Sequence, residues 1–396
     1  MSDAIERFEV RVPDSVLTDL RHRLAQTRVP DQIEGTGWEN GFPVDYLGEL
    51  VAYWRDRYDW RAQEARLNDF EHFRTNIDGQ SIHFIHARSA HPGAFPLLMT
   101  HGWPGSVVEF LDVIPRLTGP EAHGGGTADA FHVIVPSLPG YGFSEPTRTS
   151  GWDVRRIASA FIELMRRLGY TRYGAQGGDW GAQVATSIGA LDPGRCAAIH
   201  LNMPIGERPD EPVPLSDEDR ADLAAIQHFQ REESGYAVEQ ATKPQTLGVA
   251  LNDSPAGLLA WIVEKFRTWS DCDGHPENVY SRDQLITNVM MYWVTQTITS
   301  SVRLYWENKQ ASSAAEAPER VGVPTGVARY PKEVLRFPRS WVERRYNVTY
   351  WADMPRGGHF AAMEQPALFV DDLRSFFRTV RARPPDEPTR ERSSQL

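Results

Sequence analysis

The chain has 396 residues, and at roughly 150 residues per domain this length predicts two or three folding units. It carries 42 Lys and Arg against 53 Asp and Glu, so the net charge of −11 argues against nucleic acid and anionic membrane as partners. Hydrophobic residues make up 41% and charged residues 24%, which excludes a disordered or fibrous chain and predicts an ordinary globular protein.

The cysteine content and the N-terminus indicate a cellular compartment. Cys196 and Cys272 are too few for a disulfide scaffold or a Cys-based zinc site, and they suit a reducing environment. Residues 1–7 lack the apolar segment of a signal peptide, and no apolar run reaches membrane-spanning length. We therefore expect a cytoplasmic protein without a membrane anchor.

Residues 1–92 are predicted to form an accessory region of helices followed by a β-hairpin. Asp14 is placed to cap a first helix, and a second apolar stripe at helical spacing runs from Tyr46 to Tyr58. From residue 73 the hydrophobic period changes to two, and it is interrupted by Asp78-Gly79, a dipeptide typical of tight hairpin turns.

Continuous apolar runs then alternate with helical stretches in residues 93–206. Three of these runs are Pro96 to Thr100, Phe131 to Val135 and Ala197 to Leu201. Runs of this kind are typical of strands that are buried on both faces. They predict an α/β fold with a mostly parallel sheet and helices on both of its faces.

The sheet pattern is interrupted by a long helical block. An acidic, proline-rich stretch begins near residue 207, and most of residues 207–320 are predicted to be helical. The strand pattern returns in residues 321–381, so the block is predicted to be a lid inserted into the α/β domain. Residues 382–396 are expected to be a disordered tail.

The segment Gly177-Gly178-Asp179-Trp180-Gly181 has the spacing of the strand-to-helix elbow that presents the nucleophile in α/β-hydrolases. Asp179 stands where that motif usually has serine, and the two outer glycines would leave room for a very tight turn. The alternative interpretation is that Asp179 only caps the following helix.

An aspartate at the elbow predicts a different reaction from a serine. A carboxylate has a reference pKa of about 4, so it is already ionised at neutral pH and suits displacement at saturated carbon. The product would be an alkyl ester of Asp179. Hydrolysis of that ester by water needs a general base, so a histidine is expected further along the chain.

His359 is the candidate base, because it follows the last predicted strand and because the order nucleophile, acid, histidine is that of α/β-hydrolases. Glu333 follows the preceding predicted strand and is the candidate acid partner. Asp353 competes for that role, and Glu333 could also be a carboxylate in the first turn of a helix, so spacing alone leaves the choice open.

Two segments could supply backbone donors to an oxyanion. His101-Gly102-Trp103-Pro104 follows a predicted strand, as the motif requires, whereas His123-Gly124-Gly125-Gly126 precedes a strand and is interpreted as a surface loop. The N–H groups of Trp103 and Trp180 are therefore predicted to stabilise the tetrahedral state of ester hydrolysis.

Taken together, these motifs resemble the epoxide hydrolase family, in particular its microsomal-type branch with an N-terminal region of its own. The similarity extends over about residues 5 to 380. The matching segments are His101 to Ser106, Pro139 to Ser144, Gly177 to Gly181, Leu251 to Pro255 and Arg356 to Ala362, together with Tyr53 to Arg55 and Ile82 to His86.

The resemblance implies a set of catalytic residues and a reaction. Asp179 would be the nucleophile, His359 the base and Glu333 its partner, while Tyr236 and Tyr305 of the lid would donate hydrogen bonds to the epoxide oxygen. A phenol of pKa about 10 can protonate the alkoxide that forms when the ring opens. Many members of the branch carry a membrane anchor, which is not expected here.

We therefore predict an epoxide hydrolase that adds water to a small apolar epoxide to give a vicinal diol, without a metal or organic cofactor, and that forms a homodimer. The alternatives are a haloalkane dehalogenase, whose elbow and first step are similar, and a non-catalytic ligand-binding member of the fold. The identity of the epoxide, and a role in detoxification or in biosynthesis, are left open.

Overall fold

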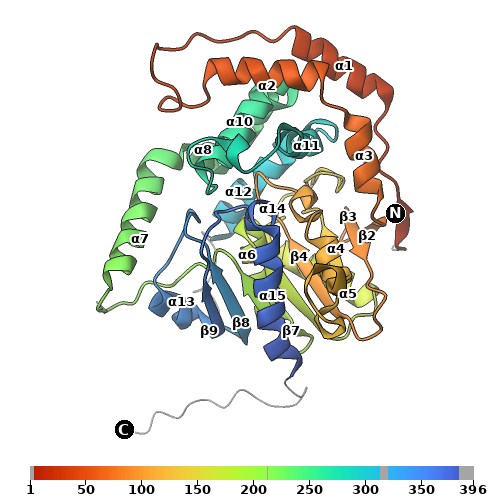
Figure 1. Ribbon diagram of the computed structural model, residues 1–396, viewed down its shortest axis with the longest axis vertical. Helices are drawn as coiled ribbons and strands as arrows, with labels where there is room; N and C mark the ends of the chain where they lie inside the picture. Colours follow the sequence, from red (N-terminus) through yellow and green to blue (C-terminus); the bar gives the residue numbers. More distant parts are fainter. Residues whose placement is uncertain (1–3, 212, 313–319, 383–396) are drawn as a thin grey trace.

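The computed structural model describes residues 4–211, 213–312 and 320–382, and in this part of the chain nine strands form one sheet (Figure 1). Their order in the sheet is β1-β2-β3-β5-β4-β6-β7-β8-β9. The strands are β1 (Glu6–Phe8), β2 (His72–Ile77), β3 (Gln80–Ala87), β4 (Phe95–Thr100), β5 (Phe131–Pro136), β6 (Tyr173–Gly177), β7 (Cys196–Leu201), β8 (Val321–Arg329) and β9 (Tyr346–Asp353).

The six strands from β4 to β9 pair in parallel, as predicted from their continuous apolar runs. Leu97, Leu98 and Met99 of β4 are fully buried although successive side chains point to opposite faces of the sheet. Both faces are therefore covered, which is the environment in which parallel sheets occur.

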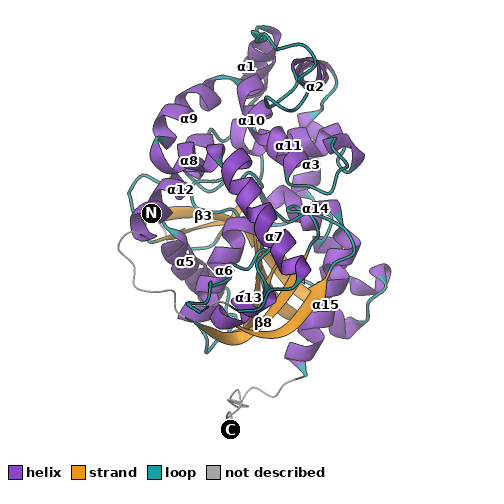
Figure 2. Ribbon diagram, turned by 90° about the vertical axis from the view of Figure 1, so that its left-hand side faces the viewer, coloured by secondary structure: helices purple, strands orange, loops and turns teal. Residues whose placement is uncertain are grey.

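Helices cover both faces of the sheet, and Figure 2 shows α6 and α15 on opposite sides of it. On one side Gly189 of α6 lies against Val321 and Val323 of β8, and on the other the ring of Phe376 in α15 lies against Gly326. The helices of the α/β part are α4 (Ile114–Thr118), α5 (Val154–Arg167), α6 (Asp179–Leu191), α13 (Arg339–Arg345), α14 (Ala361–Glu364) and α15 (Pro366–Arg381). The predicted architecture is confirmed.

The hairpin predicted near residue 73 is present, and it extends the central sheet. Asp78 and Gly79 have φ angles of 53° and 75°, the left-handed geometry of the tight turn that suits the twist of two antiparallel strands. Strand β3 pairs antiparallel with β2 on one side and with β5 on the other. The hairpin thus joins the same sheet as the strands that carry the elbow.

The inserted helices lie between β7 and β8 in the chain and beside the sheet edge where the parallel strands end (Figure 1). They are α7 (Asp217–His228), α8 (Gly235–Thr242), α9 (Pro244–Asp253), α10 (Pro255–Thr268), α11 (Arg282–Trp293) and α12 (Ile298–Ser312). Residues 313–319, near the end of the predicted lid, lie outside the described residues, as does the predicted tail from residue 383 onward.

The N-terminal helices are α1 (Asp14–Ala25), α2 (Val44–Asp56) and α3 (Trp60–Asn68), and the first two pack on this lid (Figure 1). The hydroxyl of Tyr53 donates to Asp283 of α11 at 2.9 Å, which ties α2 to the lid. The predicted capping role of Asp14 is wrong. Helix α1 begins at Asp14 without a side-chain cap, because that carboxylate pairs with Arg61 of α3 instead.

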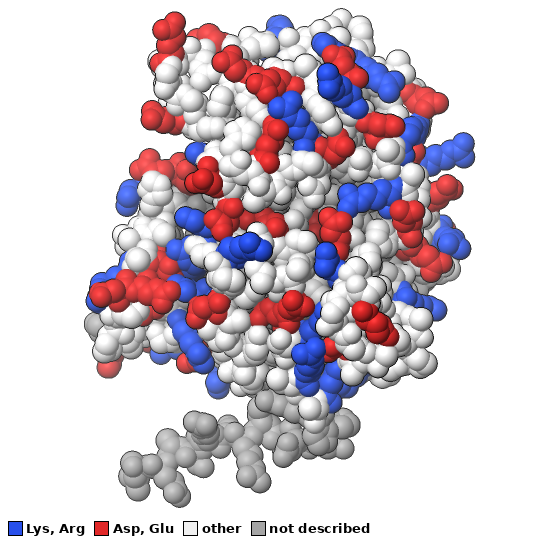
Figure 3. Space-filling model, in the orientation of Figure 1, with Lys and Arg blue, Asp and Glu red and all other residues white. Residues whose placement is uncertain are grey.

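The surface and the helix lengths bear on the expected partners. Lys and Arg side chains are interspersed with Asp and Glu over the face shown in Figure 3, so the negative charge is not gathered in one patch there. No single helix of the described residues is long and apolar enough to cross a membrane. Helices α9 and α10 pass that test only as a pair, and they are bent by 115° at their junction.

Candidate active site

The elbow sequence forms a strained strand-to-helix turn. Asp179 has a φ angle of 50°, a left-handed conformation that costs roughly 1 to 3 kcal/mol for a side chain other than glycine. A Cβ atom at Gly177 would overlap Gly181, and one at Gly181 would overlap the carbonyl of Thr100. The capping alternative is wrong, because Gly178 is the N-cap residue and Asp179 is the first residue of α6.

The two oxygens of Asp179 have different environments. The backbone N–H of Trp103 donates to Oδ1 at 2.8 Å, while Oδ2 lies 3.4 Å from Nε2 of His359. Gly102 makes this placement possible, since a Cβ atom there would overlap the Asp179 carboxylate. One oxygen is therefore held by the main chain and the other faces the imidazole. Trp180 follows Asp179 at the start of α6, and its predicted donor role stays a prediction.

His359 and Glu333 form a buried pair. Nδ1 of His359 lies 2.7 Å from Oε1 of Glu333, and both side chains are at most 3% exposed. The other ring nitrogen faces Asp179, so the order across the site is Glu333, His359, Asp179. Asp353, the competing acid, lies at the end of β9 with 65% of its side chain exposed and pairs with Arg329 instead.

The charges on either side of His359 control its protonation. Burial lowers the pKa of the imidazole, but the carboxylates of Glu333 and Asp179 outweigh that effect and hold the pKa well above 6.5. The two carboxylates therefore favour the protonated form of His359. Any reaction that neutralises Asp179 removes one of these stabilising charges and lowers the pKa of His359.

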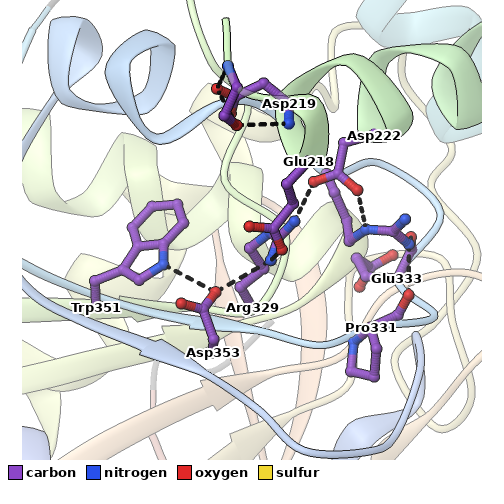
Figure 4. Close-up of polar contacts among 10 residues, drawn as sticks. Glu218, Asp219, Asp222, Arg329, Pro331, Glu333, Trp351 and Asp353 are labelled. Carbon is purple, nitrogen blue, oxygen red and sulfur yellow. Dashed lines mark hydrogen bonds and ion pairs between the residues drawn. The ribbon is translucent and has the colours of Figure 1, made fainter.

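The turn that carries Glu333 is anchored from the lid. Nη1 of Arg336 donates to the carbonyls of Pro331 and Glu333 at 2.7 and 2.9 Å, and Nε donates to Asp222 of α7 at 2.8 Å. Figure 4 shows Asp222 reaching from the lid toward this turn. Asp222 also pairs with Arg329 at the end of β8. Nothing in the spacing of these residues predicts the link, because it joins segments more than 100 positions apart.

The two lid tyrosines meet beside the elbow. Tyr236 is the second residue of α8 and Tyr305 lies in α12, and their ring centroids are 5.9 Å apart at 80°. Burial raises both phenol pKa values far above 10, and the Asp179 carboxylate raises them further. Both hydroxyls therefore stay protonated and can serve only as donors to a nearby anion or epoxide oxygen.

Aromatic rings surround the reactive groups. Three tryptophans lie close to the lid tyrosines, as the distances between ring centroids show. Trp103 stacks on Tyr236 at 5.2 Å, Trp180 packs edge-to-face with Tyr305 at 4.8 Å, and Trp269 lies 5.1 Å from Tyr236. Aromatic pairs in such offset or edge-to-face geometry are favourable beyond the area that they bury. The space in front of Asp179 is therefore bounded by apolar surfaces, with the phenols and the carboxylate as its polar points.

Two buried glutamates near the site were not predicted from the sequence. Glu364 accepts hydrogen bonds from the N–H groups of Asp271, Gly358 and Phe360, so it holds the loop on which His359 stands. Glu109 is 9% exposed and lies near both Asp179 and His359. A single glutamate in a helix pattern carries no local signal that would reveal either position.

The assembled groups can perform nucleophilic displacement followed by base-assisted hydrolysis. The side chain of Asp179 is 15% exposed, Nδ1 of His359 lies against Glu333 as a base and its partner would, and the Trp103 N–H donates to Oδ1. Within the described residues, no three His, Cys, Asp or Glu side chains come close enough together to hold a metal ion.

Two family models match the chain. The model described as "Epoxide hydrolase N terminus" matches residues 5–110, and the one described as "alpha/beta hydrolase fold" matches residues 96–260. The first spans the N-terminal helices and the hairpin, and the second spans the elbow and the beginning of the lid. Together the two models match residues 5–260 of the chain.

Individual proteins are similar over almost the whole chain. A protein from Stigmatella aurantiaca is 51% identical over 96% of this chain and 86% of its own length. "Epoxide hydrolase 1" of Sus scrofa is 41% identical over 94% of this chain and 88% of its own. The crystal structure of juvenile hormone epoxide hydrolase from the silkworm Bombyx mori superposes with a TM-score of 0.89 and 34% identity, covering 96% of this chain and 95% of that one. The protein therefore belongs to the epoxide hydrolase family of the α/β-hydrolase fold.

Proposed function

We propose that the protein hydrolyses an epoxide to a vicinal diol through a covalent ester on Asp179. The observation that carries this function is the arrangement around Asp179. One of its oxygens accepts from the Trp103 N–H, the other faces His359, and two buried phenols lie beside the same carboxylate. The names of its relatives, which include epoxide hydrolases of mammals and insects, support the same reaction.

In the first step Oδ2 of Asp179 attacks a carbon of the epoxide ring and the carbon–oxygen bond of the ring breaks. The electron pair of that bond stays on the epoxide oxygen, which takes a proton from Tyr236 or Tyr305. The phenols are suited to this role because their raised pKa keeps them protonated in the free enzyme. The aromatic surfaces around the site favour a small apolar epoxide.

In the second step a water molecule hydrolyses the ester. His359 takes a proton from water through Nε2, the oxygen attacks Cγ of Asp179, and the negative charge that develops on Oδ1 is stabilised by the Trp103 N–H and, we propose, by that of Trp180. In the collapse, the bond from Cγ to the ester oxygen breaks and that oxygen takes the proton from His359, which releases the diol. The Asp179 carboxyl group that remains is uncharged, and its proton restores the tyrosine hydroxyl that was consumed in the first step. Because the ester is uncharged, the pKa of His359 is lower at this stage than in the free enzyme, which makes the imidazole available as a base.

A single turnover in heavy-oxygen water tests the covalent path. The attacking water oxygen ends in the Asp179 carboxylate, so the first diol released should carry unlabelled oxygen from the enzyme. The label should then appear in the diol in later turnovers. Mass spectrometry of the diol and of the peptide that contains Asp179 measures both. Full labelling of the first diol would show direct attack of water on the epoxide and contradict the proposal.

Removing both lid hydroxyls should stop ring opening. Each single variant, Tyr236→Phe or Tyr305→Phe, is expected to lose about 10-fold in the rate of ester formation and the double variant at least about 100-fold, because the alkoxide leaves without a proton donor. Stopped-flow measurement of ester formation checks this. The matched control is Tyr350→Phe, whose hydroxyl donates to Asp372 at 2.7 Å outside the site. An unchanged rate in the double variant would refute the roles of these tyrosines.

The same assays separate the proposed function from its alternatives. A haloalkane dehalogenase would release halide from alkyl halides and would not need the phenols, since a halide leaves without a proton. A non-catalytic member would form no diol from any of a panel of aryl and alkyl epoxides. The cytoplasmic location and the homodimer stay predictions, and cell fractionation and analytical ultracentrifugation test them.

A further inference from the structure

A small cavity lies directly beside the catalytic groups. It has a volume of about 20 Å³, which is room for a single water molecule. Asp179 and His359 form part of its wall, together with Glu109, Gln176 and Asn202. Its lining, all from the described part of the chain, includes neither Tyr236 nor Tyr305, so the lid tyrosines do not border this cavity.

Glu109 contributes a buried carboxyl group to this wall. It lies in a short 3₁₀ helix, Val107–Phe110, that follows the segment carrying the Trp103 donor. A Cβ atom at Gly105 would overlap the Glu109 carboxylate, so the side chain lies over that glycine. Burial is the main cause that raises the pKa of Glu109 to about 8, and the nearby Asp179 adds to it while His359 opposes it. At neutral pH the group is therefore mostly an uncharged acid, with one hydrogen-bond donor and one acceptor.

Gln176 contributes a second polar group. It is the penultimate residue of β6 and is 1% exposed. Its side-chain nitrogen donates to Asn202 at 3.3 Å, but its oxygen Oε1 is buried without a hydrogen-bond partner. A buried polar atom without a partner costs roughly 1 to 3 kcal/mol, so an unpaired acceptor on the wall of a water-sized cavity is what a bound water would satisfy.

We propose that this cavity holds the water that hydrolyses the Asp179 ester, and that Glu109 and Gln176 position it. The inference rests on the proposed function. Such a water would have the polar partners that a buried water needs in the Glu109 carboxyl, the Gln176 oxygen and Nε2 of His359. It would reach the ester carbon from a side that the bound substrate does not occupy, because the substrate is joined to Asp179 in front of the lid tyrosines.

The proton balance of this step involves only groups already described. One water proton moves to Nε2 of His359, the water oxygen bonds to Cγ of Asp179, and the bond from Cγ to the ester oxygen Oδ2 breaks, so that this oxygen leaves with the diol. The released alkoxide takes the proton back from His359. An uncharged Glu109 cannot take the water proton itself, so it orients the water and leaves the proton to the histidine.

The test separates the two chemical steps. Glu109→Leu removes both hydrogen-bonding atoms at similar volume and is expected to slow ester hydrolysis by at least about 10-fold, while ester formation changes by less than about 2-fold. The alkylated enzyme should then accumulate, which intact-protein mass spectrometry detects during turnover of the best aryl or alkyl epoxide. Glu109→Gln keeps a donor and an acceptor and should recover most of the hydrolysis rate.

A second buried glutamate, Glu64, provides the matched control for Glu109. Glu64→Gln alters another buried glutamate, far from the site, which accepts from the Val12 N–H and from Trp60, and it should change neither step. Equal slowing of both steps in Glu109→Leu, or hydrolysis at the normal rate in that variant, would overturn the water site. If Glu109→Leu does not fold, hydrolysis at an unchanged rate in Gln176→Met would overturn it. Failure of the unaltered enzyme to form any ester would instead overturn the proposed function.

Discussion

Replacing Asp179 with glycine is expected to reduce diol formation by at least about 10⁴-fold and to abolish the covalent adduct, because no other carboxylate can reach the electrophile from the elbow. Glycine suits the left-handed φ angle of 50° at this position better than alanine, so the turn should form without added strain. Steady-state turnover and intact-protein mass spectrometry measure the two effects.

A control distinguishes loss of the nucleophile from a general loss of structure. Asp371→Gly removes an exposed aspartate of α15 that pairs with Arg374 in the same helix, and it should leave the chemistry unchanged. Thermal unfolding of Asp179→Gly should stay close to that of the unaltered protein. Turnover within about 10-fold of normal in a folded Asp179→Gly variant would mean that the reaction does not pass through an ester at this residue.

Replacing His359 with glutamine is expected to trap the ester. Ring opening needs the Asp179 carboxylate and the phenols, whereas hydrolysis needs Nε2 of His359 to take a proton from water. Turnover should therefore fall by about 10² to 10⁴-fold while the alkylated enzyme accumulates to nearly one equivalent. Rapid quenching followed by mass spectrometry measures the amount of ester and its lifetime. A His359→Gln variant that releases diol without accumulating ester would contradict the assignment of His359 as base.

The pH dependence of the unaltered enzyme follows from the same histidine. Only neutral imidazole accepts a proton, so the rate of ester hydrolysis should fall as the pH drops below the pKa of His359 in the alkylated enzyme. In the free enzyme Glu333 and Asp179 hold that pKa well above 6.5, and esterification removes the Asp179 contribution. We therefore expect the pKa seen in hydrolysis to lie below that of the free enzyme. His91→Gln, at a partly exposed histidine that pairs with Glu121, is the matched control.

Local patterns in the sequence were sufficient for the elements that carry the nucleophile. The alternation of apolar runs and helices predicted the parallel strands β4 to β9, and Asp78-Gly79 predicted the hairpin, because both depend on neighbouring residues only. The elbow was predicted for the same reason. Gly177 and Gly181 are required by the close approach of a strand and the helix that follows it.

The choice of the acid partner shows where local patterns end. Glu333 and Asp353 both follow a strand and precede His359, so spacing did not decide between them. In the structure β8 and β9 pair in parallel, and beyond their ends Lys332 pairs with Gly358, so that Glu333 lies against the ring of His359 while Asp353 is exposed beside Arg329. The geometry of the complete sheet makes that distinction, and no short segment contains it.

The sequence by itself determined the class of fold and singled out the elbow aspartate and His359 as candidates, because each depends on a few adjacent residues whose steric or chemical needs are specific. The tertiary structure decided how distant segments meet. It joined the hairpin to the sheet, packed the first two N-terminal helices on the lid, linked Asp222 to the turn of Glu333, and enclosed Glu109 and Gln176 beside Asp179. Burial and pairing of this kind arise from packing between segments far apart in the chain. Hydrophobic periodicity predicts which face of an element is buried, but it does not predict which distant segment will cover that face.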